Sequence, residues 1–137
     1  MKMSRALGAA VLTCGLVLLA APSFAHHSVS SEFDPGICKA FTGILTNISW
    51  QNPHAFFYMD IKDARGTVES WAFQTYSVPT LKRSGMDRQA FLDNIGKEIS
   101  VRGCVARAGT KNYAAAGTLK LPDGQVRSVG QLQDDAK

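Results

Sequence analysis

Apolar and polar residues alternate with a period of two through much of this chain after residue 36, and this alternation constrains the fold more than any other feature. It is typical of β-strands that turn one face to a core and the other to water, because successive side chains on a strand point in opposite directions. The segments with strand character are 37–50, 54–62, 67–75, 97–108, 113–121 and 125–129. Turn-forming runs such as Asn52-Pro53 and Pro122-Asp123-Gly124 separate them. The sequence therefore predicts a mainly β protein.

Between the third and fourth strand segments the pattern changes to helical spacing over 77–85 and 87–95, with Asp87 as a helix cap and Gly96 as a helix end. Three strands, a helical connection and two more strands is the order of elements in an OB-fold. We therefore expect a small five-stranded OB-like barrel with a short helical connection between strands 3 and 4. Gly43 lies where the apolar register of the first strand shifts, so we expect a β-bulge there.

Residues 1–25 have the features of a secretory signal peptide. Basic residues precede an apolar run, and Ser23-Phe24-Ala25 forms a cleavage site with small residues at its first and last positions. Removing this leader would leave 112 residues without a second apolar run, so we expect a bacterial periplasmic or secreted protein with no membrane span. The expected organisation is a signal peptide at 1–25, an N-terminal extension at 26–36, the OB-like barrel at 37–130 and a frayed tail at 131–137.

The net charge argues against a nucleic-acid partner. The full chain carries 15 Lys and Arg against 11 Asp and Glu, which is a net charge of +4. Loss of Lys2 and Arg5 with the signal peptide would leave a net charge of +2. Proteins that bind nucleic acid present a strongly basic face, and so small an excess does not provide one. We therefore expect no nucleic-acid partner.

Two cysteines, Cys38 and Cys104, remain after the leader is removed. An even number of cysteines in an oxidising compartment favours a disulfide. Cys38 falls on the first predicted strand and Cys104 on the fourth, and these strands are neighbours in an OB barrel. A bridge would close a loop of 66 residues and contribute about 3–4 kcal/mol of stability. The alternative is a pair of buried free thiols, which behave as small apolar groups.

All three histidines, His26, His27 and His54, lie after the predicted leader. Cleavage after Ala25 would give His26 a free α-amine beside its own imidazole, so one residue would offer two nitrogen donors. Nitrogen-rich planar sites suit Cu(II) better than most first-row metal ions. The arrangement resembles the histidine brace of copper proteins, with His54 as the distant ligand and His27 assisting. We therefore expect a non-catalytic copper-binding module. The alternative is a frayed terminus and a His54 side chain that only hydrogen-bonds loop backbone.

Aromatic side chains suggest a second kind of site. Trp50, Phe56 and Tyr58 would form an open face of the barrel that binds a protein partner or a small ligand, unless they fill or shield the core. A third hypothesis is a copper-dependent oxidase with Tyr58 as the axial neighbour of the metal. The chain has no G-x-S-x-G elbow, phosphate-binding glycine loop or dinucleotide fingerprint. The sequence therefore favours binding over catalysis.

Several motifs of the chain are shared with one known family. The most specific are the expected mature start His26-His27-Ser28 and the block Trp50-Gln51-Asn52-Pro53-His54. The further shared positions are Glu32-Phe33-Asp34, Gly43, Tyr58, Asp60, Asp63, Gly66, Trp71-Ala72-Phe73, Leu81-x-Arg83-x-Gly85, Val101-x-Gly103 and Leu121-Pro122-Asp123-Gly124. Over nearly all of residues 26–129 the chain thus resembles a family of small exported bacterial proteins known as a domain of unknown function. The resemblance implies an OB-like barrel and an exported location, and it implies no activity.

The chain departs from that family in three respects. Gln74 stands where a glutamate is expected, and Met86 stands where a tryptophan is expected. An amide cannot ionise, so any role of that glutamate as a ligand or base is weakened here. The cysteine pair is not a feature of the family, and we interpret the Cys38–Cys104 disulfide as a local stabiliser.

Overall fold

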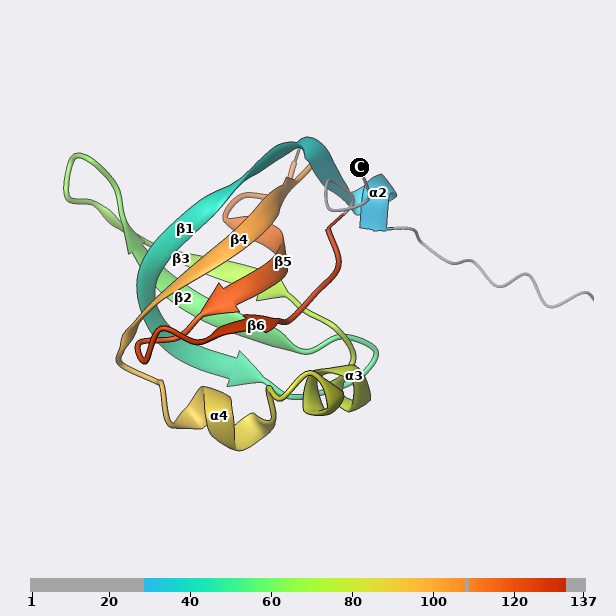
Figure 1. Cartoon of the computed structure of the whole chain (residues 1–137). Coiled ribbons are helices and arrows are strands. Elements are labelled where there is room, and N and C mark those ends of the chain that lie inside the picture. Colours follow the sequence, from blue (N-terminus) through green and yellow to red (C-terminus); the bar gives the residue numbers. More distant parts are fainter. Residues whose placement is uncertain (1–28, 108, 133–137) are drawn as a thin grey trace, which may run out of the picture.

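The longest element among the described residues is strand β1, Phe33–Ser49, which curves around the molecule in Figure 1. The computed structural model describes residues 29–107 and 109–132. The other elements are α2 (Val29–Glu32), β2 (Phe56–Lys62), β3 (Val68–Gln74), α3 (Val78–Arg83), α4 (Arg88–Leu92), β4 (Glu98–Ala106), β5 (Tyr113–Lys120) and β6 (Val126–Ser128). The first part of β1 pairs antiparallel with β4 and its last part with β2. β1 therefore joins the two halves of the sheet.

The sheet closes on itself. Neighbouring strands follow the order β3-β2-β1-β4-β5-β6, and β3 also pairs in parallel with β5, from Ala72–Tyr113 to Gln74–Ala115. These pairings confirm the predicted mainly β, OB-like barrel, and α3 and α4 form the predicted helical connection between the third and fourth strands. The predicted barrel has five strands, and the last of the six segments with strand character, 125–129, forms the short sixth strand β6, which pairs with β5.

Gly43 is not the site of a bulge, and this prediction is wrong. Gly43 pairs in regular register with Ile99 of β4, and the register shift of β1 against β2 falls further along, between Leu45 and Asn47. A Cβ atom at position 43 would lie 2.4 Å from the backbone oxygen of Asp60. The position needs a glycine because β2 approaches β1 closely where β1 passes from one partner strand to the other.

The barrel core lies inside the closed sheet. Phe57 and Phe73 are fully buried there, and their rings stack with 5.1 Å between centroids. In Figure 1, α3 and α4 cover one end of the barrel, where they contribute the buried side chains of Leu81 and Phe91. Asp87 caps α4 as predicted, because its carboxylate accepts a 2.8 Å hydrogen bond from the backbone of the first helical turn.

A second, smaller hydrophobic cluster lies on the outer face of β4 and β5. Its buried residues are Phe33, Cys104, Ala115 and Leu132, and we name these four residues the outer cluster. The predicted disulfide is present between Cys38 and Cys104, which are direct partners in the β1–β4 register. The start of β1 and the segment that follows β6 therefore meet on one side of the barrel (Figure 1).

The folded unit extends beyond its predicted boundaries. β1 begins at Phe33 rather than at Ile37, because Phe33 pairs with Ala106 across an irregularity of β1 that ends at Cys38. Leu132, which falls in the segment expected to fray, is buried. The predicted signal peptide lies outside the described residues. Within residues 29–107 and 109–132, no helix has the length and apolar character needed to cross a membrane.

Candidate functional site

His54 is held in one orientation in the loop that precedes β2. Its side chain is half-buried, and its Nδ1 atom lies 2.8 Å from the backbone oxygen of Thr75. A carbonyl oxygen only accepts hydrogen bonds, so Nδ1 carries the proton in this contact. In the neutral ring Nε2 then keeps its lone pair. His54 is therefore set to offer Nε2 to a metal ion or to a hydrogen-bond donor.

Thr75 is itself fixed, so the orientation of His54 is a property of the fold. Thr75 is buried, with 4% of its surface exposed. Its hydroxyl donates to the backbone oxygen of Ala55 at 2.9 Å, and its backbone nitrogen donates to the same oxygen at 3.0 Å. The backbone nitrogen of Ala55 in turn donates to the oxygen of Tyr76 at 3.2 Å. These bonds join the loop before β2 to the segment that follows β3.

His54 lines a cavity of about 170 Å³ beside the parallel β3–β5 pairing. At about 30 Å³ for each water molecule, this volume would hold roughly five waters or a small ligand. The other lining residues are Gln74, Thr75, Tyr76, Ala115, Ala116, Gly130 and Gln131. Alanine and glycine form much of the cavity wall. The polar groups that could contact a ligand therefore come from a few side chains, with His54 and Gln74 among them.

Tyr113, the first residue of β5, connects this cavity to α2. Its hydroxyl lies 3.0 Å from Glu32 Oε1 and 2.5 Å from Gln74 Oε1. Its ring packs against Phe33 at 5.1 Å and stacks on Phe56 at 6.3 Å between centroids. Burial raises the pKa of Tyr113, and the neighbouring Glu32 raises it further through the hydrogen bond and its charge. Tyr113 in its neutral form therefore links Glu32, at the start of the described chain, to Gln74 of the cavity wall through hydrogen bonds.

Of the three predicted metal ligands, only His54 lies in the described part of the chain. His26 and His27 lie outside it. Among residues 29–107 and 109–132, no group of three or more His, Cys, Asp and Glu side chains is placed to hold a metal ion. A metal ion at His54 would therefore need donors of another kind, or donors from outside the described residues.

The aromatic residues predicted to share a face make separate contacts. The Trp50 ring meets Phe91 of α4 at 6.1 Å between centroids and packs against the barrel core. Phe56 stacks on Tyr113 instead. Tyr58 is half-buried on β2, opposite strand residues of β1 and β3. The structure thus places Phe56 near the cavity and Trp50 against α4, and no ring contact among the described residues brings the three together.

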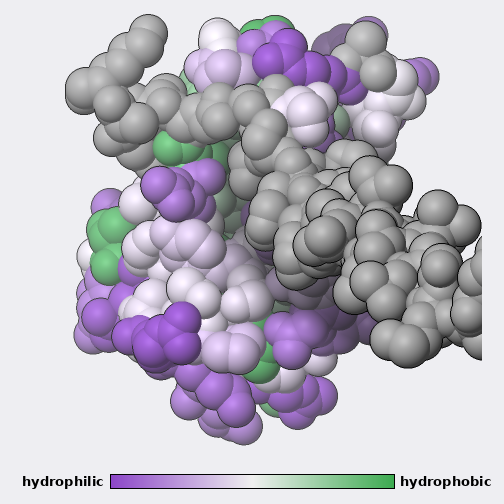
Figure 2. Space-filling view, turned by 90° about the vertical axis from the view of Figure 1, so that its right-hand side faces the viewer, coloured by the Kyte–Doolittle hydropathy of each residue, from purple (hydrophilic) through white to green (hydrophobic). Residues whose placement is uncertain are grey.

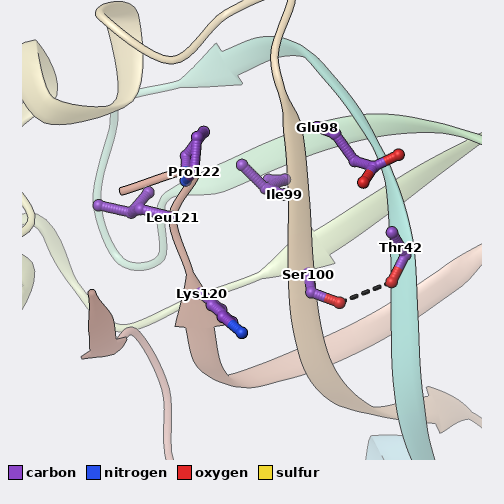
Figure 3. Close-up of a pocket in the computed structure, with 7 residues that line it drawn as sticks. All are labelled: Thr42, Glu98, Ile99, Ser100, Lys120, Leu121 and Pro122. Carbon is purple, nitrogen blue, oxygen red and sulfur yellow. Dashed lines mark hydrogen bonds between the residues drawn. The ribbon is translucent and has the colours of Figure 1, made fainter. Parts of the chain in front are cut away.

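A second concave region crosses the outer face of β1, β4 and β5. It has a volume of about 360 Å³, and its lining residues are Thr42, Glu98, Ile99, Ser100, Lys120, Leu121 and Pro122 (Figure 3). The hydroxyl oxygens of Thr42 and Ser100 lie 2.6 Å apart across the β1–β4 pair. Figure 3 shows Glu98 and Lys120 on opposite sides of Ser100. The sequence does not predict this groove, because outward polar residues on strands carry the same pattern whether they bind a ligand or only face water.

The side of the barrel that carries α2 is mostly hydrophilic where described residues form its surface. Figure 2 shows this side with largely purple and white residues and small, separate green areas. Extended exposed apolar patches mark protein-docking surfaces. The visible surface of the described residues on this side carries no extended apolar patch.

Glu32 belongs to a motif shared with the resembled family, but the sequence predicts no role for it or for Tyr113, and Gln74 is distinguished only as a departure from the family pattern. One available signal is the outward face of β5, where Tyr113 is followed by Ala115 and Gly117. A bulky phenol among very small residues on one strand face indicates that side chains from another segment pack beside the phenol ring. The hydrogen bonds to Glu32 and Gln74 join three distant segments, and no local pattern contains them.

These observations define a small OB-like barrel with a histidine-lined cavity beside its parallel strand pair. The chain belongs to a family of unknown function, DUF6152, which matches residues 12–115. This match confirms the expected membership of a family without an assigned function. No curated protein and no solved structure matches the chain. The function therefore has to be argued from the site.

Proposed function

We propose that this protein is an exported, non-catalytic copper-binding module that uses the α-amine and imidazole of His26 together with His54, with His27 assisting. The observation that carries the proposal is the orientation of His54. Its Nδ1–H donates to the Thr75 carbonyl, and proteins commonly orient metal-binding histidines by such a bond at the other ring nitrogen. Nε2 is then the donor available at the cavity.

The anchoring of α2 supports a contribution from His26. Glu32, the last residue of α2, is bonded to Tyr113, whose hydroxyl also contacts Gln74 in the cavity wall. His26 precedes Val29 by three residues, and three residues span at most about 10 Å when extended. The chain that carries the N-terminal histidines is therefore anchored beside the residue that lines the cavity with His54.

Copper fits the donor set by its chemistry. An α-amine and the imidazole of the same residue chelate one ion, and a second imidazole completes a nitrogen-rich planar arrangement, which suits Cu(II). Each nitrogen must be unprotonated to bind, so copper affinity falls as acid protonates the amine and the imidazoles. The proposed export rests on the basic start, apolar run and small-residue cleavage site of residues 1–25.

The test uses protein exported through its own leader, so that the N-terminus forms in the cell. Intact mass identifies the mature N-terminus, and a Cu(II) titration followed by EPR gives the stoichiometry and the donor atoms. We expect a mass that begins at His26, one copper ion for each chain and hyperfine structure from nitrogen ligands. A different N-terminus, or only weak and non-stoichiometric copper, would overturn the proposal.

Two substitutions in one loop separate the loss of a ligand from general damage. His54→Ala should lower Cu(II) affinity at least tenfold, because it removes the distant donor, while the circular dichroism spectrum stays that of the barrel. Gln51→Ala is the matched control, since Gln51 is exposed in the same loop and its side-chain amide donates a hydrogen bond to Ser49 at the end of β1. The control should bind copper as wild-type protein does. Unchanged copper affinity in His54→Ala would contradict the assigned role.

The interaction-module hypothesis predicts a different pattern. Under it, Trp50→Ala would abolish capture of a partner and His54→Ala would not. The metal hypothesis is supported over this one because Trp50 packs against the core and against Phe91, away from ring contact with Phe56. Consumption of oxygen or peroxide by the copper-loaded protein in the presence of a reductant would replace the non-catalytic role with that of an oxidase.

A further inference from the structure

The groove on the outer face of β1, β4 and β5 has a floor of polar side chains in register. Thr42 is the direct partner of Ser100 in the β1–β4 pairing, and Ser100 is the direct partner of Lys120 in the β4–β5 pairing. Glu98 lies two residues before Ser100 on β4, so its side chain points to the same face of the sheet. A row of polar side chains therefore crosses three strands, with a carboxylate beside it.

The hydroxyl hydrogens of this row are used within the protein. The Ser100 hydroxyl donates to the backbone oxygen of Phe41 at 3.3 Å, and its oxygen lies 2.6 Å from that of Thr42. A carbonyl oxygen only accepts, so only the Ser100 hydrogen can fill the contact with Phe41. Thr42 then donates to Ser100, and both contacts are satisfied. The floor of the groove is left with oxygen lone pairs, which suit a ligand group that donates hydrogen bonds.

Glu98 and Lys120 place opposite charges on the two sides of this floor. Figure 3 shows the Glu98 carboxylate on the β1 side of Ser100 and the Lys120 amine on the β5 side. Both side chains are exposed, and within the described parts of the chain neither forms an ion pair or a side-chain hydrogen bond. The two residues are diagonal neighbours across the β4–β5 pair, a relation that separates residues by about 7–8 Å. Both charges are therefore available to a ligand.

We propose that this groove binds short peptides with free ends, with Glu98 and Thr42 holding the ammonium group and Lys120 holding the carboxylate. An extended dipeptide spans about 7 Å, which matches the separation of the two charged residues. In a free amino acid the two charges are on adjacent carbon atoms, which is too close for this spacing. A dicarboxylate would meet repulsion from Glu98, and a diamine would meet repulsion from Lys120.

The size and the apolar edge of the groove fit the same ligand. Its volume of about 360 Å³ corresponds to roughly twelve water molecules, which is the size of a small ligand such as a dipeptide. Leu121 and Pro122 line the groove beside Lys120 and offer apolar contact to small peptide side chains. The groove shares no lining residue with the cavity of His54, so this inference does not depend on the proposed copper function.

The charge recognition is tested with three probes that differ only at their ends: dialanine, N-acetyl-dialanine and dialanine amide. Each is titrated by NMR into the exported protein in EDTA, so that copper takes no part. Dialanine should shift the backbone amides of Thr42, Glu98 and Ser100 saturably, and loss of either end charge should weaken binding about tenfold or more. Absence of saturable shifts at millimolar dialanine, shifts confined to other residues, or full affinity for either blocked probe would overturn the proposal.

Substitutions assign each end of the ligand to its residue. In Glu98→Gln dialanine and its N-acetyl form should bind alike, and in Lys120→Gln dialanine and its amide should bind alike. Glu69→Gln and Lys62→Gln are the matched controls, since both residues are exposed charges on β3 and β2 outside the groove. These controls, and His54→Ala, should bind dialanine as wild-type protein does. Undiminished discrimination between the probes in Glu98→Gln or Lys120→Gln would contradict the assigned roles.

Discussion

The barrel core and the outer cluster both exclude water, but different parts of the sequence specify them. The core takes its side chains from the inward positions of the strands and from the helices that cover one end, including Phe57, Phe73 and Phe91. The outer cluster uses outward positions of β4 and β5 and covers them with Phe33 and Leu132, which lie almost one hundred residues apart. The core is thus encoded in the local alternation, whereas the outer cluster depends on contacts between the two ends of the described chain.

This difference bears on function because the outer cluster is the region beside the candidate site. Ala115 belongs to the outer cluster and also lines the cavity of His54. Tyr113, which bonds to Glu32 and Gln74, packs against the same cluster. The disulfide reinforces this region at Cys104. The barrel core therefore supplies most of the stability, while the outer cluster determines whether the start of the chain is held near the cavity.

Loss of a core ring should have the largest effect on stability. Phe73 is fully buried and contacts the rings of Phe57 and Phe41, so Phe73→Ala should cost about 3–5 kcal/mol of unfolding free energy. Leu132→Ala makes the same kind of truncation in the outer cluster and should cost less, about 2–3 kcal/mol. Urea unfolding followed by circular dichroism measures both. A greater loss for Leu132→Ala than for Phe73→Ala would reverse the ranking of the two regions.

Removal of the disulfide should have the next largest effect. Cys38 and Cys104 are 66 residues apart, so the double variant Cys38→Ala/Cys104→Ala should lose about 2–4 kcal/mol. Hydrogen exchange should accelerate most at the start of β1 and least at the core strands β2 and β3. The control is wild-type protein in the same buffer without reductant. Uniformly faster exchange across the barrel would show that the bridge supports the whole fold rather than the outer cluster.

Alkaline pH should produce the smallest effect, through Tyr113. Burial and Glu32 raise its pKa above the ordinary value of 10.0, so the unfolded chain loses this proton first. The stabilising contribution is full below pH 10 and is lost as the pH rises toward the folded pKa. Because the side chain is partly exposed, the loss at pH 11 should be less than about 1 kcal/mol. Urea midpoints at pH 8 and pH 11 should differ less in Tyr113→Phe than in wild-type protein. An equal difference in both proteins would contradict this origin.

The strand pattern and the disulfide were predictable because both follow from local or topological rules. Alternation with a period of two identifies the strands, their order identifies the barrel, and the barrel places Cys38 opposite Cys104. The start of β1 was not predictable, since a Pro-Gly pair such as Pro35-Gly36 is typical of a turn between elements and not of a strand interior. In the structure Asp34 accepts a 2.9 Å hydrogen bond from the Gly36 backbone, and the strand resumes beyond this irregularity.

The candidate site was predictable only in part. His54 could be singled out as a rare residue after a turn, and the structure places it at a cavity. Trp50 and Phe56 could not be assigned to different surroundings, because the packing of α4 against the barrel decides where the Trp50 ring lies. The group formed by Glu32, Gln74 and Tyr113 depends on three segments that meet only after the barrel has closed.

Phe33 and Leu132 lie in one cluster near the two limits of the described residues, which makes a circular permutation informative. The start of β1 and the segment up to Leu132 meet in the outer cluster, so a short linker between the ends, with new termini opened in the exposed Ala64–Gly66 turn, should leave the barrel intact (Figure 1). In such a protein the nitrogen of His26 would be part of an ordinary peptide bond. The same side chains would remain, and the primary amine would be lost. The topology thus provides a way to remove the α-amine that we propose binds copper without substituting any residue.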